Sequence, residues 1–538
     1  MKLLKKILRR VIRHNNTSVV ELPIAKEIDE KDSVSRKRDI DTIRTSLLFN
    51  EKWYREKYEL GEYCDVAEHY LLQGWKEGKN PSDLFSTDEY LAMYPEVGQA
   101  GINPLLHFEQ EGFEAGYYAK KIRDKHEKIK EENPQCIGSM EHGLLRVRMT
   151  NACNAKCRYC GVRLGFGSEK EHEMDKKFYY AYCKSIYSQL NMILLTGGDP
   201  YITQESYNYM KYLGDNYPHI TVFTESNGIA FDEKFQNLAM NNLFSTHFSL
   251  NASNEDVYAK SCWEGSGGEA VYSKFMKNIQ DYVSLLERND LLVFAPDYSM
   301  VINNDNYFDI VDFVKLCLRL HANKISFYFD YTENNMNASY FGTPELIRPV
   351  LKQLMELERV LAGKLILMFR LWIPIAEVEP MQKQVEAISL SCLKEKYADI
   401  LEMASNRCVD REFARRNELR KQYGKRELSF AEDFYATVRY VEHNGENICF
   451  APWHELDLYP NGRIDVCSWV NAMANINDYV VDGVVDWEHL INSYKYMSMR
   501  KKMLFKNYQD CMACCPMNEE TSPAETMVKY GYERKFCK

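Results

Sequence analysis

Three closely spaced cysteines are the residues of this sequence whose chemistry is easiest to state. Cys153, Cys157 and Cys160 lie in the stretch Asn151–Cys160, directly after the strand-like run Leu144–Met149. Thiolates select iron–sulfur clusters or zinc, and no fourth Cys or His lies nearby to close a four-ligand zinc site. Iron–sulfur clusters normally take four cysteines, so three leave one iron without a protein ligand. The stretch therefore predicts a cluster with one iron open to chemistry; a zinc knuckle or incidental cysteines are the alternatives.

The pattern C-x3-C-x-aromatic-C, with Tyr159 as the aromatic residue, resembles the signature of the radical S-adenosylmethionine (radical SAM) superfamily. The resemblance implies a 4Fe-4S cluster on the three cysteines, whose open iron binds the amino and carboxylate groups of S-adenosyl-L-methionine. In that family the cluster donates an electron that splits the sulfonium and gives a 5′-deoxyadenosyl radical. The resemblance also implies an electron donor of low potential, of the flavodoxin or ferredoxin type.

Apolar runs separated by helix-length segments are the elements that must position this stretch. They cover residues 144–149, 192–195, 220–224, 246–250, 291–294 or 299–302, and 325–329. Strands that alternate with helices favour an α/β fold with a parallel sheet. About six such units match the partial (β/α)6 TIM-like barrel of the radical SAM superfamily. Functional residues of such barrels gather at the carboxyl ends of the strands.

A glycine pair follows the second apolar run. Gly197 and Gly198 let the backbone approach a ligand closely, and the neighbouring Asp199 can accept hydrogen bonds from an ammonium group. By position the Gly-Gly-Asp-Pro element resembles the Gly-Gly-Glu-Pro element of the superfamily, which holds the methionine amino group. Because Asp is shorter than Glu, the glycine carbonyls are the safer assignment.

The third and fourth strand ends carry further polar residues. The run Thr224–Gly228 looks like the family's Thr-Asn-Gly strand end, whose role is mostly to shape the barrel mouth. Ser249 and Asn251 resemble the Ser-Leu-Asp element that bonds the ribose hydroxyls or the methionine carboxylate, and Asn can still donate and accept. Lys260 is either a cation for that carboxylate or a solvated lysine on a helix face.

No catalytic acid or base can be assigned from the sequence. Glu225, Asp330 and Glu333 are candidates at strand ends, and Cys262 is a candidate radical-relay thiol. Each has a surface or packing role as an equal alternative.

The C-terminal part holds a second group of cysteines. Cys449 and Cys467 flank a Pro-Asn-Gly turn between two β-prone runs, which predicts a hairpin, and Cys511 and Cys514 form a distant C-x2-C pair. This layout resembles the auxiliary-cluster domain of the SPASM and twitch subfamily of radical SAM enzymes. The further cysteine run of the full SPASM form is missing, so the resemblance implies one auxiliary 4Fe-4S cluster on these four cysteines, with Cys515 as a rival fourth ligand. A zinc ribbon is the alternative.

Residues 48–118 contain an internal repeat. Matching residues are Phe49, Tyr54 and Tyr58 with Phe85, Tyr90 and Tyr94, and His69, Gly74 and Gly78 with His107, Gly112 and Gly116. Each copy predicts short aromatic-rich helices that end at a glycine. The layout resembles repeats attached to glycosyltransferases and other enzymes of bacterial surface-polysaccharide assembly. Among so many aromatic residues, we expect the two histidines to be packing residues and not ligands.

Composition limits the classes of function. The chain of 538 residues is 45% hydrophobic and 27% charged, as ordinary soluble proteins are. Its net charge of −10, from 68 basic and 78 acidic residues, argues against nucleic acid as the main partner. With 16 cysteines and no signal peptide or membrane-spanning run, the sequence predicts metal sites in a reducing cytoplasm.

The first 16 residues are basic, with apolar residues at helical spacing. A helix of this kind either lies on an anionic membrane surface, here the inner face of the membrane, or docks on another domain. Both interpretations stay open at the level of sequence.

These features divide the chain into segments. They are a basic N-terminus and linker (1–46), a two-copy helical repeat domain (47–122), a connector (123–140), a radical SAM core barrel (141–335), a helix-rich bridge (336–440) and a SPASM/twitch-like auxiliary-cluster domain (441–538).

The resemblance implies a radical SAM oxidoreductase that abstracts hydrogen from a substrate C–H. The repeats suggest a sugar, nucleotide-sugar or glycan-linked substrate in surface-polysaccharide synthesis. A peptide maturase of the SPASM class is the enzymatic alternative, although the repeats do not look like the peptide-clasping winged helix-turn-helix domain that such enzymes often carry. A non-catalytic scaffold with structural clusters is the alternative from another class.

Overall fold

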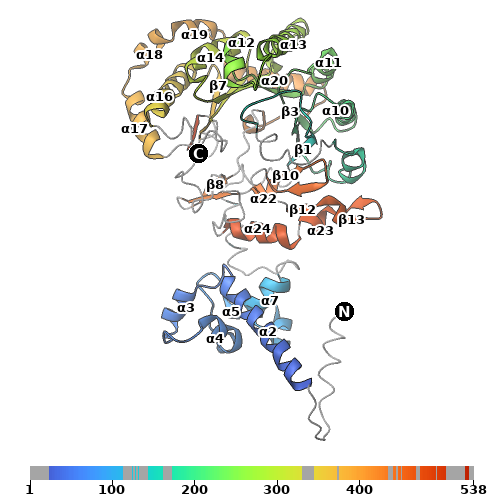
Figure 1. Ribbon diagram of the computed structural model, residues 1–538, viewed down its shortest axis with the longest axis vertical. Helices are drawn as coiled ribbons and strands as arrows, with labels where there is room; N and C mark the ends of the chain where they lie inside the picture. The colour runs from blue at the N-terminus through green and yellow to red at the C-terminus, as the bar shows by residue number, and fades with distance from the viewer. Residues whose placement is uncertain are drawn as a thin grey trace. The chain divides into compact units, whose positions relative to one another are not determined.

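The computed structural model describes the greater part of the chain. The described residues are 24–112, 143–160, 173–329, 344–371, 375–433, 440–443, 446–449, 451–467, 473–491, 493–504 and 528–531, with the single residues 124, 128, 131 and 470. The chain divides into two compact units, Met1–Arg123 and Asp124–Lys538, which we describe separately (Figure 1). Among the described helices, none combines the length and the apolar composition that crossing a bilayer requires.

The described part of the first unit is helical. Its elements are α2 (Ile24–Thr45), α3 (Glu51–Lys57), α4 (Val66–Leu72), the 3-10 helix η1 (Gly74–Glu77), α5 (Thr87–Met93), α6 (Pro95–Gln99), α7 (Pro104–His107) and the π-helical turn η2 (Phe108–Gly112). Polar side chains begin several of these short helices, because an Asn, Asp or Ser just before the helix accepts from a free backbone N–H. The left-handed Gly78 (φ 71°) ends η1, as the repeat predicts.

An equivalent tyrosine–histidine pair lies within each copy of the repeat. The Tyr54 hydroxyl lies 3.0 Å from Nδ1 of His69, and the Tyr90 hydroxyl lies 2.9 Å from Nδ1 of His107. Both tyrosines are buried and pack edge-on against their histidine. Burial lowers the pKa of both histidines, which favours the neutral ring. The expectation that these are packing histidines is confirmed.

A large mixed sheet is the centre of the second unit. Its strand order is β12-β11-β10-β1-β2-β3-β4-β5-β6-β7-β15. The strands are β1 (Leu144–Thr150), β2 (Met192–Gly197), β3 (Thr221–Ser226), β4 (Ser245–Ser249), β5 (Asp297–Ile302), β6 (Lys324–Phe329), β7 (Ile366–Leu371), β10 (Glu455–Leu458), β11 (Arg463–Asp465), β12 (Ala474–Asn475) and β15 (Val528–Gly531). Strands β1 to β7 and β10 are parallel, whereas β11, β12 and β15 add antiparallel pairs at the edges.

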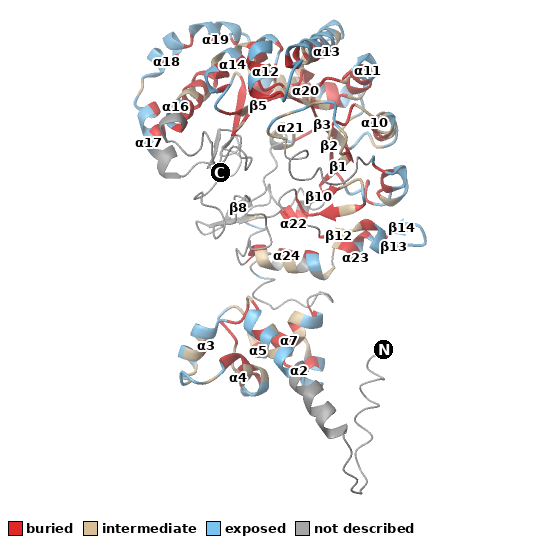
Figure 2. Ribbon diagram, in the orientation of Figure 1, coloured by how far each residue is buried: buried red, intermediate tan, exposed pale blue. Residues whose placement is uncertain are grey.

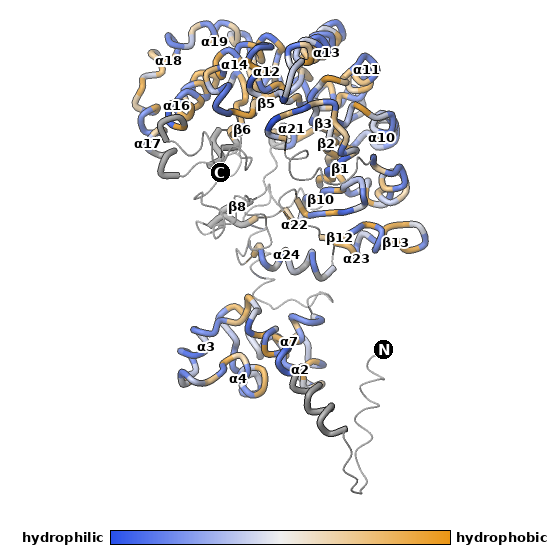
Figure 3. Tube along the Cα trace, in the orientation of Figure 1, coloured by the Kyte–Doolittle hydropathy of each residue, from blue (hydrophilic) through white to orange (hydrophobic). Residues whose placement is uncertain are grey.

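Helices connect the parallel strands and cover the sheet. They are η4 (Phe178–Tyr182, π-helical), α10 (Gln204–Asn216), α11 (Glu233–Asn242), α12 (Glu255–Ser261), α13 (Gly268–Arg288), η5 (Leu292–Phe294), η6 (Tyr307–Asp309), α14 (Ile310–Arg319), α16 (Pro344–Leu361), α17 (Ile375–Glu386), α18 (Leu390–Lys396), α19 (Ala398–Met403), α20 (Val409–Gln422) and α21 (Phe430–Asp433). Figure 2 shows buried strands beneath helices whose outer faces are exposed. Figure 3 shows the same division by hydropathy. Burial of these apolar faces is what drives the layers together.

The C-terminal part contributes small elements beside the large sheet. They are the hairpin β8 (Tyr440–His443) and β9 (Glu446–Cys449), α22 (Ala451–His454), η8 (Ile476–Tyr479), the hairpin β13 (Val480–Val481) and β14 (Val484–Val485), α23 (Trp487–Ile491) and α24 (Tyr494–Leu504). The predicted hairpin around the Pro-Asn-Gly turn is confirmed as β10 and β11, with Gly462 at φ 83°.

The predicted α/β class and parallel sheet are confirmed, but the sheet is wider than six strands. Of the two candidates for the fifth strand, the run 299–302 is correct, because 292–294 forms a 3-10 helix. Strand β7, which the sequence places in the bridge, pairs in parallel with β6. Strand β10, placed in the auxiliary domain, pairs in parallel with β1. The described sheet therefore extends past both edges of the predicted six strands.

Candidate functional site

The cysteine stretch forms a loop at the carboxyl end of β1. Residues 151–160, which we call the cysteine loop, follow a register shift between Arg148 and Thr150 at the end of the strand. Cys153 is exposed, and Cys157 and Cys160 are half-buried. The loop therefore places three cysteines, none of them fully buried, at the end of the sheet where functional residues gather in parallel α/β folds.

The glycine pair at the end of β2 packs directly on the cysteine loop. The backbone N–H of Gly198 donates to the carbonyl of Thr150 at 2.6 Å, and the N–H of Asp199 donates to the carbonyl of Ala152 at 3.0 Å. A Cβ on Gly198 would lie 1.8 Å from the carbonyl oxygen of Ala152, and Gly197 adopts φ 125°. Both positions therefore require glycine, because any side chain would push the loop away.

Asp199 is completely buried and turns inward. Its carboxylate accepts hydrogen bonds from the Ser226 hydroxyl at 2.7 Å and from the backbone N–H groups of Asn227 and Tyr201, both at 2.9 Å. Burial raises the pKa of this carboxyl group, and the three hydrogen bonds oppose that shift. The carboxylate links the end of β2 to the end of β3 and so helps to position these two strand ends. The predicted contact of Asp199 with a ligand stays a prediction.

Asn227, which sequence reasoning assigns only to the barrel mouth, reaches the cysteine loop. Its Nδ2 lies 3.4 Å from Sγ of Cys153 and donates to the Asn154 side chain at 2.9 Å. The backbone N–H of Ala155 is a second donor to the same sulfur, at 3.4 Å. A sulfur that accepts two hydrogen bonds suits a thiolate ligand. The position of Asn227 directly after β3 is the sequence feature that could have identified it as a site residue.

The other side of the cysteine loop is held by the segment after α12. The N–H of Arg158 donates to the carbonyl of Cys262 at 2.9 Å, and Cys157 forms an antiparallel bridge with Trp263. The Arg158 guanidinium also contacts the carbonyl of Lys260 and lies 3.1 Å from Asp305. Lys260 therefore meets the loop through its backbone, while the residue itself is exposed.

Tyr159, the aromatic residue of the pattern, points into the protein. Its hydroxyl is buried against the thiol of Cys262, and within the described residues no atom meets hydrogen-bond geometry with it. Burial raises the pKa of the Cys262 thiol to about 11, which keeps it protonated at neutral pH. The radical-relay role of Cys262 stays a prediction.

Asn251, just after β4, adopts a left-handed backbone conformation. It is buried with φ 64°, its Oδ1 accepts from the N–H of Val301 at 2.9 Å, and its Nδ2 donates to the carbonyl of Ser249 at 3.0 Å. Asn tolerates the left-handed region better than most residues. These bonds join β4 to β5, so most of the side chain's capacity is used within the protein. Ser249, the last residue of β4, is half-buried, and its predicted ligand contact stays a prediction.

The donor set of the cysteine loop fits an iron–sulfur cluster. Within the described residues, no three His, Cys, Asp or Glu side chains converge on the position of a single metal ion. Thiolates on a cube bind different irons at separate corners, so they need not converge as ligands of one ion do. Three cysteines on one short loop, none of them fully buried and one of them accepting two hydrogen bonds at its sulfur, are consistent with that requirement.

The C-terminal cysteines are only partly described. Cys449 ends β9 and is half-buried, and Cys467 is buried just after β11. Cys511, Cys514 and Cys515 lie outside the described residues, as do Asp330 and Glu333.

Buried charges join the hairpin that precedes Cys467 to the core sheet. Asp457 on β10 is 1% exposed and accepts two hydrogen bonds from Arg148 on β1, at 3.0 and 2.8 Å. The Tyr459 ring lies between two guanidinium groups, 4.5 Å from that of Arg148 and 4.6 Å from that of Arg463. Bidentate pairs of this kind fix geometry as well as adding energy.

Comparison with known families identifies the core. Residues 147–317, from β1 into α14, match the model of the radical SAM superfamily. The chain therefore contains a radical SAM domain, whose cofactors are a 4Fe-4S cluster and S-adenosyl-L-methionine.

Curated relatives match only part of the chain. GTP 3′,8-cyclase of Campylobacter lari is 23% identical over 179 residues, which cover 32% of this chain and 52% of that protein. GTP 3′,8-cyclase of Campylobacter curvus is 28% identical over 113 residues, which cover 21% of this chain and 35% of that protein. The chain thus spans about half, or less, of the length of these relatives.

Solved structures show a distant likeness over more of the chain. Streptococcus suis SuiB shares 14% identity and a TM-score of 0.43, covering 82% of this chain and 88% of that chain. Native anSMEcpe with bound AdoMet shares 14% identity and a TM-score of 0.44, covering 73% and 94%. At these TM-scores the likeness carries no functional argument.

Proposed function

We propose that the chain is a radical SAM enzyme that abstracts hydrogen from a C–H bond of a sugar, nucleotide-sugar or glycan-linked substrate in bacterial surface-polysaccharide synthesis. The observation that carries the proposal is the cysteine loop, held on one side by Gly197 and Gly198 and on the other by the segment after α12. When bound, the reduced cluster and S-adenosyl-L-methionine supply a 5′-deoxyadenosyl radical.

The residues of the chain have distinct tasks in this proposal. Cys153, Cys157 and Cys160 would hold the cluster through their thiolates, and we assign Tyr159 to the same cofactor site. The Asn227 amide fixes the Cys153 sulfur by a hydrogen bond. We assign the carbonyls of the glycine pair and the strand-end residue Ser249 to the binding of the methionine and ribose groups. The external electron comes from a donor of the flavodoxin or ferredoxin type.

The oxidoreductase part of the proposal depends on the C-terminal cysteines. We assign Cys449, Cys467, Cys511 and Cys514 to one auxiliary 4Fe-4S cluster, with Cys515 as the rival for the fourth position. That cluster would take the electron left after hydrogen abstraction. Support comes from the buried contact between Arg148 and Asp457, which attaches the hairpin of Cys467 to the strand that ends at the cysteine loop.

The carbohydrate substrate rests on the resemblance of the N-terminal repeats to those of polysaccharide-assembly enzymes. A peptide maturase would use the same cysteine loop and is the alternative outcome. Membrane contact through the first 16 residues stays a prediction, because these residues lie outside the described part of the chain.

Iron counting after anaerobic reconstitution tests the cluster assignment. We expect about eight iron atoms per chain in the wild type and about four in the triple variant Cys153→Ala, Cys157→Ala, Cys160→Ala. S-adenosyl-L-methionine should change the electron paramagnetic resonance spectrum of the reduced wild type and leave that of the triple variant unchanged. An unchanged iron content in the triple variant would refute the assignment, and a spectrum that never responds would favour the scaffold.

A further inference from the structure

A short backbone ladder runs along one side of the cysteine loop. Lys156 and Arg158 of the loop each form one backbone hydrogen bond of 2.9 Å with residues 262–264, which we call the partner segment. Cys157 lies between these two residues and forms an antiparallel bridge with Trp263. The position of this cysteine therefore depends on the position of the partner segment.

The partner segment needs support from outside its own part of the chain. It lies between α12, which ends at Ser261, and α13, which begins at Gly268. Helix α12 has only seven residues, and a helix of that length is not stable without tertiary contacts. Contacts with other elements must therefore hold the segment against the cysteine loop.

Asn303, directly after β5, makes such a contact. Its Nδ2 donates to the carbonyl of Ser261, the residue just before the partner segment, at 3.2 Å. The last carbonyls of a helix have no donor within the helix, so a side chain from another element can satisfy them. Asn303 is 8% exposed and Ser261 is 2% exposed. At that depth, a carbonyl that loses its donor is costly to leave unpaired.

The loop after β5 holds the Asn303 side chain in place. The backbone N–H of Asn303 donates to Oδ1 of Asn306 at 2.8 Å, and Oδ1 of Asn303 accepts from the N–H of Asp305 at 2.9 Å. Asn306 is completely buried and also donates to the carbonyls of Asn251 and Val301, at 3.3 and 2.9 Å. The Asn303 amide is therefore fixed relative to the ends of both β4 and β5.

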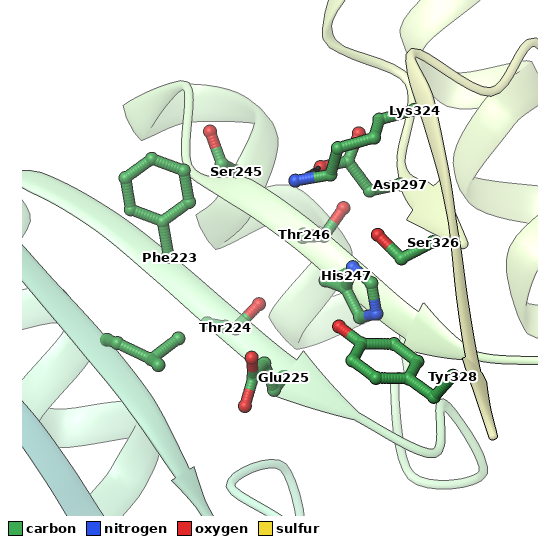
Figure 4. A pocket seen from close by; sticks show the side chains of 11 residues that line it. Phe223, Thr224, Glu225, Ser245, Thr246, His247, Asp297, Lys324, Ser326 and Tyr328 are labelled. Carbon is green, nitrogen blue, oxygen red and sulfur yellow. Dashed lines mark ion pairs between the residues drawn. The ribbon is translucent and has the colours of Figure 1, made fainter. Parts of the chain in front are cut away.

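Strand β5 is a firm support for this loop. It pairs with β4 on one side and with β6 on the other. At its amino end, Asp297 pairs with Lys324 of β6 at 3.0 Å, and both side chains are largely buried (Figure 4). The strand ends at Ile302, the residue before Asn303. Moving Asn303 would therefore disturb the strand pairing on both sides of β5.

A second link between the cysteine loop and α12 is more exposed. The Arg158 guanidinium contacts the carbonyl of Lys260 and lies 3.1 Å from Asp305. The side chains of Arg158 and Asp305 are 48% and 52% exposed. Ion pairs with this exposure contribute little, because water competes for both charges. We therefore expect the buried Asn303 amide to be the stronger of the two links.

We infer that Asn303 is a positioning residue for the cysteine loop. Its amide holds the partner segment against the loop and thereby sets where Cys157 lies relative to the ends of β4 and β5. The inference rests on the proposed radical SAM function, in which the cluster on this loop meets S-adenosyl-L-methionine at those strand ends. Asn303 acts through the partner segment and needs no contact of its own with the cofactor.

Hydrogen exchange on the full-length protein without clusters tests the contact itself. Asn303→Asp keeps the size of the side chain and the acceptor for Asp305, but it lacks the amide donor. Asn303→Ser is a second, uncharged variant whose hydroxyl can still serve the turn but is too short to reach α12. In both variants we expect the amides of Arg158 and Glu264 to exchange about tenfold or more faster than in the wild type, because the ladder opens more often.

Asn417→Asp is the matched control. The Asn417 side chain, on α20, also accepts from a backbone N–H and donates to a backbone carbonyl, both of Leu428. The control therefore loses the same kind of donor at a site that has no part in the ladder. We expect exchange of the Arg158 and Glu264 amides to match the wild type.

Electron paramagnetic resonance of the reconstituted, reduced protein gives the second readout. In the two Asn303 variants, we expect the half-maximal spectral change to need about tenfold more S-adenosyl-L-methionine than in the wild type. The concentration needed by Asn417→Asp should stay at the wild-type value. A loss of stability alone would not separate the Asn303 variants from this control.

Two results would overturn the inference. One is equal exchange of the Arg158 and Glu264 amides in the Asn303 variants and the control, and the other is faster exchange with an unchanged response to S-adenosyl-L-methionine. A wild-type cluster that never responds to S-adenosyl-L-methionine refutes the proposed function instead, and the exchange result then decides the role of Asn303 by itself.

Discussion

At the scale of single residues, the site depends on contacts between the cysteine loop and neighbouring strand ends. Asn227 donates to the Cys153 sulfur, and Gly198 leaves room for the carbonyl of Ala152. Partners of this kind around metal ligands orient the ligands and tune the site. The conformation of the cysteine loop is thus set by contacts with three strand ends and with the segment after α12, as well as by its own residues.

Replacing Asn227 should weaken the cluster. In Asn227→Ala the Cys153 sulfur loses one of its two hydrogen-bond donors, and we expect the rate of iron loss to a chelator to rise by about 10–100-fold. The measurement is the decay of cluster absorbance under anaerobic conditions. Asn216→Ala is the control, because within the described part of the chain the Asn216 amide bonds only a carbonyl of its own helix α10. Equal decay in both variants would show that the Asn227 contact does not matter.

The spacing of the cysteines was enough to predict the loop, whereas the inward turn of Asp199 and Asn251 was not. Their types suggest ligand contacts, but their side chains bond to β3 and β5. The Asn227 contact joins residues 74 positions apart, so a local pattern could not reveal it. Which of several strand-end residues meets the loop depends on strand order and register, and these are set by the packing of the whole sheet.

At the scale of elements, the parallel pair β1 and β10 joins the radical SAM domain to the C-terminal part. Local patterns predicted each of the strands β1 to β6 and the hairpin. They did not predict that β7 and β10 lie in the same sheet. The Arg148–Asp457 bond spans 309 positions in sequence. Pairing between strands so far apart cannot be predicted from the residue pattern of either strand.

Neutralising Asp457 should loosen the C-terminal hairpin. In Asp457→Asn, Arg148 keeps its buried charge without a counter-charge, and we expect a loss of about 3–5 kcal/mol in the free energy of unfolding. Urea unfolding followed by tryptophan fluorescence measures this loss. Iron counting should show that the proposed auxiliary cluster is lost before the cluster proposed for the cysteine loop. Asp478→Asn, at an exposed position on η8, is the control and should change neither quantity. Equal stability of the two variants would contradict the account.

At the scale of the whole molecule, a buried charge group holds α20 against the amino ends of the core strands. Asp433 bonds both Arg416 and Arg420, and Arg416 also donates to the carbonyl of Val293 beside β5. Burial alone would raise the pKa of Asp433, but the two arginines hold it below its ordinary value. The sequence predicted this region only as a charged, helix-rich bridge, because the partners of a buried charge depend on tertiary packing.

The stabilisation that Asp433 contributes to the folded state should decrease on acidification. Its pKa is lower in the folded state, so the unfolded chain binds the proton more tightly and acid removes the stabilisation. We expect the difference in unfolding free energy between wild type and Asp433→Asn to be about 3–5 kcal/mol and constant from about pH 7 to 5. The difference should shrink below about pH 4, as the ordinary pKa of an Asp is passed. Urea unfolding at a series of pH values measures it, and a difference that grows on acidification would contradict the assignment.

The most direct measurement of the central claim is the formation of 5′-deoxyadenosine by the anaerobically reconstituted protein with dithionite and S-adenosyl-L-methionine. The account predicts 5′-deoxyadenosine from the wild type and none above background from Cys157→Ala. Cys392→Ala, at an exposed cysteine on α18, is the matched control and should retain the wild-type yield. A wild-type protein with a full complement of iron and sulfide that forms no 5′-deoxyadenosine, or a Cys157→Ala variant that forms as much as the wild type, would contradict it.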